Sequence, residues 1–129
     1  MEVLSSRTII VSGDLQQSRS FYEGTLGLRV YREYGSGGDV TGVVLFAGGG
    51  FLELTGGSPV GAGDAVKLWL QVPALDGVES TLRQAQVKIN KPAGRMPWGL
   101  IELWIEDPDG IEIRLIEVPP EHPLRRRLS

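Results

Sequence analysis

The sequence predicts an α+β fold: two βαβββ modules that form curved mixed sheets around a cavity, with the helices outside. The first observation is order, because the predicted elements run strand, helix and three strands, and then repeat. The second is spacing. The first strands of the two halves begin at Arg7 and Lys67, 60 residues apart (67 − 7), and their last strands carry Glu53 and Arg114, 61 apart (114 − 53). One helix does not cover a curved four-stranded sheet, so we expect the halves to pair around the cavity.

The chain has 129 residues, which favours a single domain. We expect module one over about 7–56, module two over about 65–118 and a tail over 119–129. The stretch 56–64, which contains Gly56-Gly57-Ser58-Pro59, is predicted to be the joint between the modules.

Module one is predicted to begin with a β-branched strand over 7–11. A helix follows, with Asp14 as its N-cap, Gln17 three residues later as in a capping box, and Gly24 and Gly27 at its end. The remaining elements are three strands at 28–32, 40–47 and 51–55, with a glycine-rich loop at 35–39 and a glycine turn at 48–50.

Module two is predicted to begin with a strand over 67–72, in which apolar and polar residues alternate, and Pro73 ends it. Apolar residues at helical spacing predict a helix over 75–85. The remaining elements are strands at 87–91, 100–106 and 111–118, with a loop at 92–99 and a turn at 107–110.

Composition excludes several classes of function. The formal net charge of −3 gives no reason to expect nucleic acid or an anionic membrane as a partner. The chain has no cysteine, and its single histidine, His122, lies in the tail, which argues against a His-based metal site or a Ser/His/Asp triad. The longest aliphatic or aromatic run, 43–47, is too short to cross a membrane, and no signal peptide is apparent. We therefore expect a cytoplasmic protein.

Strand parity predicts which side chains line the cavity. Residues opposite the helix-facing aliphatics belong to this set, and four of them are charged: Arg7, Glu53, Lys67 and Arg114. Trp69 shares the face of Lys67, and Trp104 lies opposite Leu103 and Ile105 in parity. The predicted ligand-binding residues are Arg7, Glu53, Lys67, Trp69, Trp104 and Arg114.

The chain resembles the vicinal oxygen chelate superfamily, which includes glyoxalase I, the bleomycin-resistance proteins and extradiol dioxygenases. The resemblance is carried by 13–18 with Phe21-Tyr22 and 26–28, by 51–55, and by 106–110 with 113–117. It covers roughly residues 7–118. It implies two βαβββ modules and, in many members, a homodimer in which two chains build each cavity.

In metal-dependent members of that family, four positions hold the metal, and they fall here on Arg7, Glu53, Lys67 and Arg114. Only Glu53 is a ligand type, because protonated cations repel a divalent metal and offer no lone pair. We therefore predict a site with no metal and no cofactor.

These four residues have two readings. They form either an internal ion-pair network that replaces a lost metal, or a cavity whose surplus of +2 (three cations, one anion) favours an anionic ligand. Trp69, Trp104 and Trp98 likewise serve either core or interface packing or stacking on a planar ligand.

The first functional hypothesis is a metal-independent protein that binds a small anionic or aromatic molecule and acts by sequestration. The second is a metal-independent isomerase, lyase or cyclase with Glu53 and Lys67 as the catalytic candidates, and Tyr22, Tyr31 and Glu102 as further acids or bases. The third is a metal-dependent glyoxalase or dioxygenase, which the ligand positions argue against.

Overall fold

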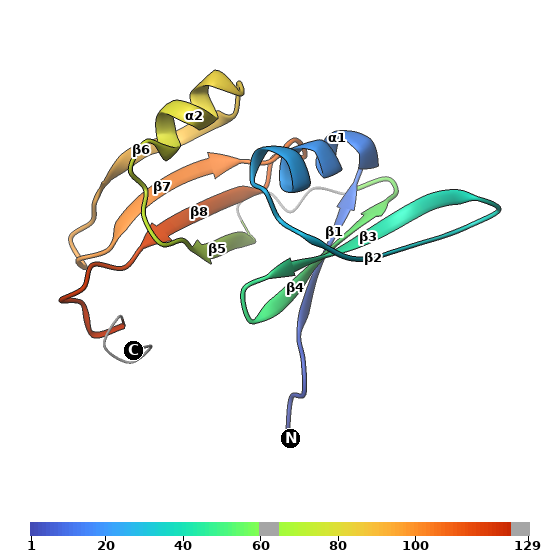
Figure 1. Ribbon diagram of the computed structural model, residues 1–129, viewed down its shortest axis with the longest axis horizontal. Helices are drawn as coiled ribbons and strands as arrows, with labels where there is room; N and C mark the ends of the chain where they lie inside the picture. Colours follow the sequence, from blue (N-terminus) through green and yellow to red (C-terminus); the bar gives the residue numbers. More distant parts are fainter. Residues whose placement is uncertain (60–64, 125–129) are drawn as a thin grey trace. The chain divides into compact units, whose positions relative to one another are not determined.

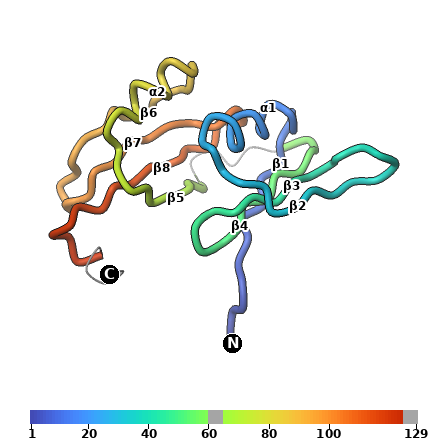
Figure 2. The backbone as a smooth tube through the Cα atoms, in the orientation of Figure 1, coloured from blue at the N-terminus to red at the C-terminus, as the bar shows by residue number. Residues whose placement is uncertain are grey.

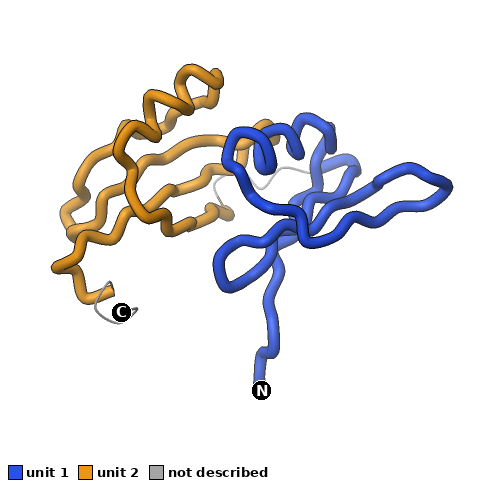
Figure 3. The backbone as a smooth tube through the Cα atoms, viewed as in Figure 1, with its two compact units in different colours: residues 1–61 blue, residues 62–129 orange. Residues whose placement is uncertain are grey.

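A computed structural model of the chain describes residues 1–59 and 65–124 (Figure 1). The chain divides into two compact units, residues 1–61 and 62–129 (Figure 3). Followed along the chain, each unit runs strand, helix and three strands (Figure 2).

The first unit contains a four-stranded mixed sheet in the order β1-β4-β3-β2. Strand β1 runs parallel to β4, and the other neighbours are antiparallel. The strands are β1 (Arg7–Ser12), β2 (Val30–Ser36), β3 (Asp39–Ala47) and β4 (Gly50–Gly56), with α1 (Leu15–Arg19) and the π-helix η1 (Ser20–Thr25) between β1 and β2.

The second unit repeats this topology in the order β5-β8-β7-β6, again with its first and last strands parallel. Its elements are β5 (Lys67–Gln71), α2 (Val78–Gln84), β6 (Lys88–Arg95), β7 (Ile101–Glu106) and β8 (Glu112–Glu117). The predicted α+β class with two βαβββ modules is confirmed.

Each sheet buries one face and leaves the other more open, because successive strand residues point to opposite sides. The buried face of the first sheet carries Ile10, Val43, Leu45, Leu52 and Leu54, and that of the second carries Leu68, Leu103, Ile105, Ile113 and Leu115. The residues between them face the other side, which we call the open face of each sheet. Strand parity therefore predicted the core-facing residues correctly.

The helix of the first unit begins where it was predicted to begin. The carboxylate of Asp14 accepts the backbone N–H of Gln17 at 3.0 Å. The widened π-helical turn after Arg19 was not predicted from the sequence. It contains Phe21 and Tyr22, which are buried and meet edge to face with ring centroids 4.9 Å apart.

Three predicted boundaries were wrong. The loop expected at 35–39 is a two-residue turn, since Gly37 and Gly38 take positive φ angles of 63° and 86° and the strands continue around them. The helix expected from residue 75 begins at Val78, after Gly77 with φ 72°. The loop expected at 92–99 is strand as far as Arg95. Pro92 is tolerated there because β6 is an edge strand with register shifts.

Residues 60–64 of the predicted joint and 125–129 of the predicted tail lie outside the described residues. Among the helices that are described, none is long and apolar enough to cross a membrane.

Candidate functional site

Strand register sorts the open-face residues into three rows across each sheet. The rows of the first sheet are Arg7, Phe51 and Phe46; Ile9, Glu53, Val44 and Arg32; and Val11, Thr55, Gly42 and Tyr34. The rows of the second sheet are Lys67, Glu112, Glu106 and Lys88; Trp69, Arg114, Trp104 and Lys91; and Gln71, Ile116, Glu102 and Gly94. All six predicted ligand-binding residues therefore lie on open faces.

Glu53 is held by two donors on the open face of the first sheet. Arg7 Nη1 donates to Glu53 Oε1 at 2.7 Å, and Tyr34 Oη donates to Oε2 at 2.6 Å. The side chain of Glu53 is 12% exposed, whereas that of Arg7 is 40% exposed. Both carboxylate oxygens are thus engaged within the first unit.

Sequence reasoning missed Tyr34, although Gly42 signals it. A Cβ atom built on Gly42 would lie 2.2 Å from Cζ of the Tyr34 ring. A glycine within a strand often marks such a close approach. Here it lets the Tyr34 ring cross β3 and bring its hydroxyl to Glu53.

These contacts shift the titration of both acids. The hydrogen bond from Tyr34, followed by that from Arg7, holds the pKa of Glu53 below its ordinary value, although desolvation opposes this. The same hydrogen bond to Glu53 raises the pKa of Tyr34. Glu53 is therefore a weakened base and Tyr34 a weakened acid.

Three aromatic rings lie beside the Arg7–Glu53 pair. The ring centroids of Tyr31, Phe46 and Phe51 are 5.0 to 5.7 Å apart, and the Arg7 guanidinium lies 5.9 Å from that of Phe51. Tyr31 is 51% and Phe46 45% exposed. The open face of the first sheet thus presents apolar rings next to a compensated ion pair.

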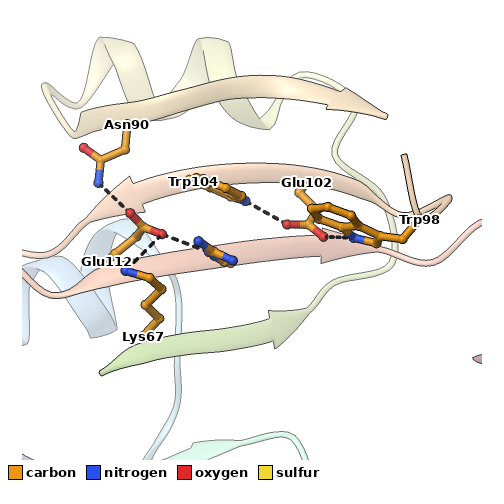
Figure 4. A network of polar contacts seen from close by, with 7 residues as sticks. Lys67, Asn90, Trp98, Glu102, Trp104 and Glu112 are labelled. Atoms are coloured by element: carbon orange, nitrogen blue, oxygen red, sulfur yellow. Dashed lines mark hydrogen bonds and ion pairs between the residues drawn. The ribbon is translucent and has the colours of Figure 1, made fainter. Parts of the chain in front are cut away.

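On the open face of the second sheet, two cations share one carboxylate (Figure 4). Arg114 Nε donates to Glu112 Oε1 at 2.9 Å, and Lys67 Nζ lies 3.9 Å from the same oxygen. Asn90 donates to the other oxygen of Glu112 at 3.3 Å. Sequence reasoning missed Glu112, which the parity of Arg114 two residues further on could have indicated. With Glu112 included, the charges of Lys67, Arg114 and Glu112 in the second unit sum to +1.

Tryptophans flank Arg114 in its row. The Arg114 guanidinium stacks 3.7 Å above the centroid of Trp104, and Lys91 Nζ lies 5.9 Å from the same centroid. Trp69 is the register partner of Arg114 and is 49% exposed. The ring of Trp104 is therefore packed against Arg114, whereas the ring of Trp69 is half exposed.

Glu102 lies at the other end of this face and is 3% exposed. Trp98 Nε1 donates to Glu102 Oε2 and Trp104 Nε1 donates to Oε1, both at 2.7 Å (Figure 4). The sequence indicated Glu102 as a candidate acid or base, but not these two partners. Of the other candidates, Tyr22 is fully buried in the core.

The structure brings Arg7 and Glu53 together in the first unit, and Lys67, Trp69, Trp104 and Arg114 onto one face of the second. The convergence of these two groups on one cavity stays a prediction.

The residues at the four family positions do not fit a divalent metal. Three of them are cations, and the single carboxylate, Glu53, has both oxygens engaged by Arg7 and Tyr34. Over residues 1–59 and 65–124, no group of three His, Cys, Asp or Glu side chains is arranged to hold a metal ion. The side chains at these positions therefore do not fit a metal-dependent reaction.

Two four-stranded mixed sheets of the same topology, each with charged and aromatic residues on its open face, define a βαβββ-repeat protein. The sequence matches the model of the Glyoxalase/Bleomycin resistance protein/Dioxygenase superfamily over residues 5–115, and the chain belongs to that superfamily. The resemblance inferred from the sequence is thereby confirmed.

Solved structures agree with this assignment. A member of the same superfamily from Sphaerobacter thermophilus is 25% identical, with a TM-score of 0.68, 90% of this chain covered and 98% of the other. TioX from Micromonospora sp. ML1 is 19% identical, with a TM-score of 0.71 and coverages of 89% and 98%. Lactoylglutathione lyase from Agrobacterium tumefaciens is 17% identical, with a TM-score of 0.64 and coverages of 91% and 94%. The last two likenesses show the fold alone. No curated protein matches the chain.

Proposed function

We propose that the protein is a metal-independent binding protein that sequesters a small planar aromatic molecule bearing an anionic group. The observation that carries this proposal is the sharing of Glu112 by Lys67 and Arg114, beside the half-exposed ring of Trp69. One negative charge does not compensate two positive ones, so a ligand carboxylate would be attracted to this part of the open face.

The geometry supports a grip on the anion by Arg114. Arg114 donates to Glu112 through Nε, and its stacking on Trp104 fixes the plane of the guanidinium. A planar guanidinium recognises a carboxylate through two parallel N–H groups. The ring of the ligand would then rest on Trp69, the register partner of Arg114.

The alternative is a metal-independent isomerase, lyase or cyclase that uses Glu53 and Lys67. A general base that works near neutral pH needs a raised carboxyl pKa. Tyr34 and Arg7 instead lower the pKa of Glu53, which favours binding over proton abstraction. Incubation with candidate metabolites and mass spectrometry of the products would reveal turnover, which the binding proposal does not expect.

The binding proposal is tested by calorimetry with quinoline-2-carboxylate and with neutral quinoline. We expect the anion to bind about tenfold more tightly, and Arg114→Gln to remove most of that preference, because hydrogen bonds to charged groups contribute about 1.5–3 kcal/mol. The matched control is Arg83→Gln, since Arg83 lies on α2 and pairs with Glu79 away from the open face. Equal affinity of the two compounds would overturn the proposal.

We also propose that the protein is cytoplasmic and that it is a homodimer, an assembly that the family resemblance supports. Sedimentation equilibrium should give twice the chain mass of 14.0 kDa. A monomer at micromolar concentration would contradict this.

A further inference from the structure

The sequence contains two aspartate–glycine pairs, Asp76-Gly77 before α2 and Asp109-Gly110 before β8. In such a pair the backbone nitrogen of the glycine can attack the carboxyl carbon of the aspartate side chain and close a five-membered succinimide ring. Glycine favours this attack because it has no Cβ atom to hinder the approach. In a folded protein the attack also requires that the glycine N–H is not held in a hydrogen bond. The two pairs differ in this respect.

Asp76 and Gly77 are the two central residues of an exposed turn between β5 and α2 (Figure 1). The turn is closed by the N–H of Val78, which donates to the carbonyl of Leu75 at 3.1 Å. Gly77 has φ 72° and ψ −6°, the values of the third residue of a type II turn. The peptide bond between the two central residues takes no part in the hydrogen bond that closes such a turn.

The Asp76–Gly77 peptide bond is therefore open to reaction. Over residues 1–59 and 65–124, neither the Gly77 N–H nor the Asp76 carboxylate has a hydrogen-bond or ion-pair partner, and α2 has no side-chain cap. Nothing lies within 4 Å of a Cβ atom built on Gly77. Solvent thus has free access to both reacting groups.

Asp109-Gly110 has the same two residues in a different place of its turn. The N–H of Gly110 closes the turn by donating to the carbonyl of Asp107 at 3.0 Å. The buried carboxylate of Asp107 also accepts the N–H groups of Asp109 and Ile111, at 2.9 and 2.8 Å. An attack by the Gly110 nitrogen would have to break this arrangement, so this pair is protected.

We infer that Asp76-Gly77 is a modification site at which the folded protein converts an aspartate into its β-linked isomer. The Gly77 nitrogen forms a bond to Cγ of Asp76, and the hydroxyl group of the protonated carboxyl leaves as water with the amide hydrogen. A water molecule then adds to the main-chain carbonyl carbon of Asp76, whose bond to the Gly77 nitrogen breaks, and that nitrogen regains a hydrogen. The chain now continues through Cγ, and the α-carboxylate is free. Water is the only co-reactant.

This modification would act on α2, because the new linkage adds one carbon atom to the main chain between two fixed points. On one side, Leu75 is buried and its N–H donates to Glu117 Oε1 at 2.8 Å. On the other, the carbonyl of Gly77 accepts the N–H of Thr81 at 3.1 Å. We expect the longer main chain to displace the first turn of α2, so the amide of Thr81 should exchange its hydrogen several-fold faster in converted molecules. The inference uses neither open face and does not rest on the proposed function.

The test is peptide mapping of the full chain after incubation in its folded state, near neutral pH and at physiological temperature. Trypsin cleaves after lysine and arginine, so the two pairs fall in separate peptides, residues 68–83 and 96–114. Electron-transfer fragmentation distinguishes β-linked from ordinary aspartate. We expect β-linked aspartate to form about tenfold faster at Asp76 than at Asp109, because the second site must first break a hydrogen bond. Equal rates, or a faster reaction at Asp109, would overturn the inference.

Two controls separate the effect of the fold from that of the sequence. In urea both turns are lost, so the rates at Asp76 and Asp109 should come together, and a difference that persists in full would overturn the inference. Asp76→Glu keeps the charge but cannot close a five-membered ring, so peptide 68–83 of this variant should contain no β-linked product while Asp109 reacts as before. A product that persists in that peptide would refute the site. None of these measurements uses a ligand, so this inference and the proposed function fail separately.

Discussion

Glu53 is a residue type that can bind a metal, yet in this structure its carboxylate is bound by two side chains. Tyr34 and Arg7 each donate to one of its oxygens. The sequence led us to expect the pairing of Glu53 with a cation, because an apolar strand does not bury a lone carboxylate. It did not lead us to expect Tyr34, since that contact depends on how a ring crosses the neighbouring strand.

The lowered pKa of Glu53 predicts a dependence of stability on pH. A carboxyl whose folded pKa lies below its unfolded pKa stabilises the fold above the unfolded value, near 4.5, and this contribution is lost as pH falls through the folded pKa. We therefore expect Glu53→Gln to lower the free energy of unfolding by about 1–2 kcal/mol at neutral pH, and by less as pH falls below the unfolded value. Urea unfolding across pH 3 to 7 measures this difference. A difference that is constant over that range would contradict the assignment.

Among the elements, strands were predicted more accurately than the segments that connect them. Alternation identified the open and buried faces, because a one-residue shift would move every aliphatic side chain to the wrong side. The π-helical turn η1 and the extension of β6 to Arg95 were missed. Apolar periodicity alone does not reveal these two features. The π-helical turn accompanies the packing of Phe21 and Tyr22, and the extension of β6 follows from its position at the edge of the sheet.

Strand β3 makes room for the Tyr34 ring at Gly42, so a side chain at this position should destabilise the first sheet. Gly42→Ala would place a Cβ atom 2.2 Å from the Tyr34 ring, forcing that ring off β3 and away from Glu53. We expect the free energy of unfolding to fall by about 1–3 kcal/mol, as in other overpacked sites. The cost should shrink in a Tyr34→Ala background, measured as a double-mutant cycle by urea unfolding.

The matched control is Gly24→Ala, since nothing lies within 4 Å of a Cβ atom there. This helical substitution should be neutral or stabilising. An equal cost of Gly42→Ala with and without Tyr34 would show that the two residues do not interact.

At the scale of the whole molecule, the repeat was predictable, whereas the contents of the site were only partly so. The spacing of Arg7 and Lys67 identified the two modules, and the family resemblance then implied the four metal-ligand positions. The two indole partners of Glu102 were not foreseen, because they depend on side-chain directions within one face, whereas Glu112 was missed although its parity with Arg114 indicates it. Arg7 and Glu53 pair with each other in the first unit, whereas Lys67 and Arg114 in the second both contact Glu112, which supports the proposal of an anionic ligand there.

The side chains at the four metal-ligand positions of the family predict how the stability of the protein responds to metals. Dialysis against a chelator should leave the thermal unfolding midpoint unchanged, and added zinc or nickel should not raise it, because a metal that binds only the folded state would stabilise it. Differential scanning calorimetry with and without each metal checks this. Stoichiometric metal in the purified protein, lost together with several degrees of stability on chelation, would contradict it.

The tyrosines and tryptophans of the chain are divided between the two units, and this division has a practical consequence. All three tyrosines, Tyr22, Tyr31 and Tyr34, belong to residues 1–61, and all three tryptophans, Trp69, Trp98 and Trp104, belong to residues 62–129. Light at the red edge of the absorption band excites indole but not phenol, so emission from the unlabelled protein reports on the second unit alone. Tyrosine difference absorbance reports on the first. Comparing the two signals during denaturation would therefore reveal whether the units unfold together or one before the other.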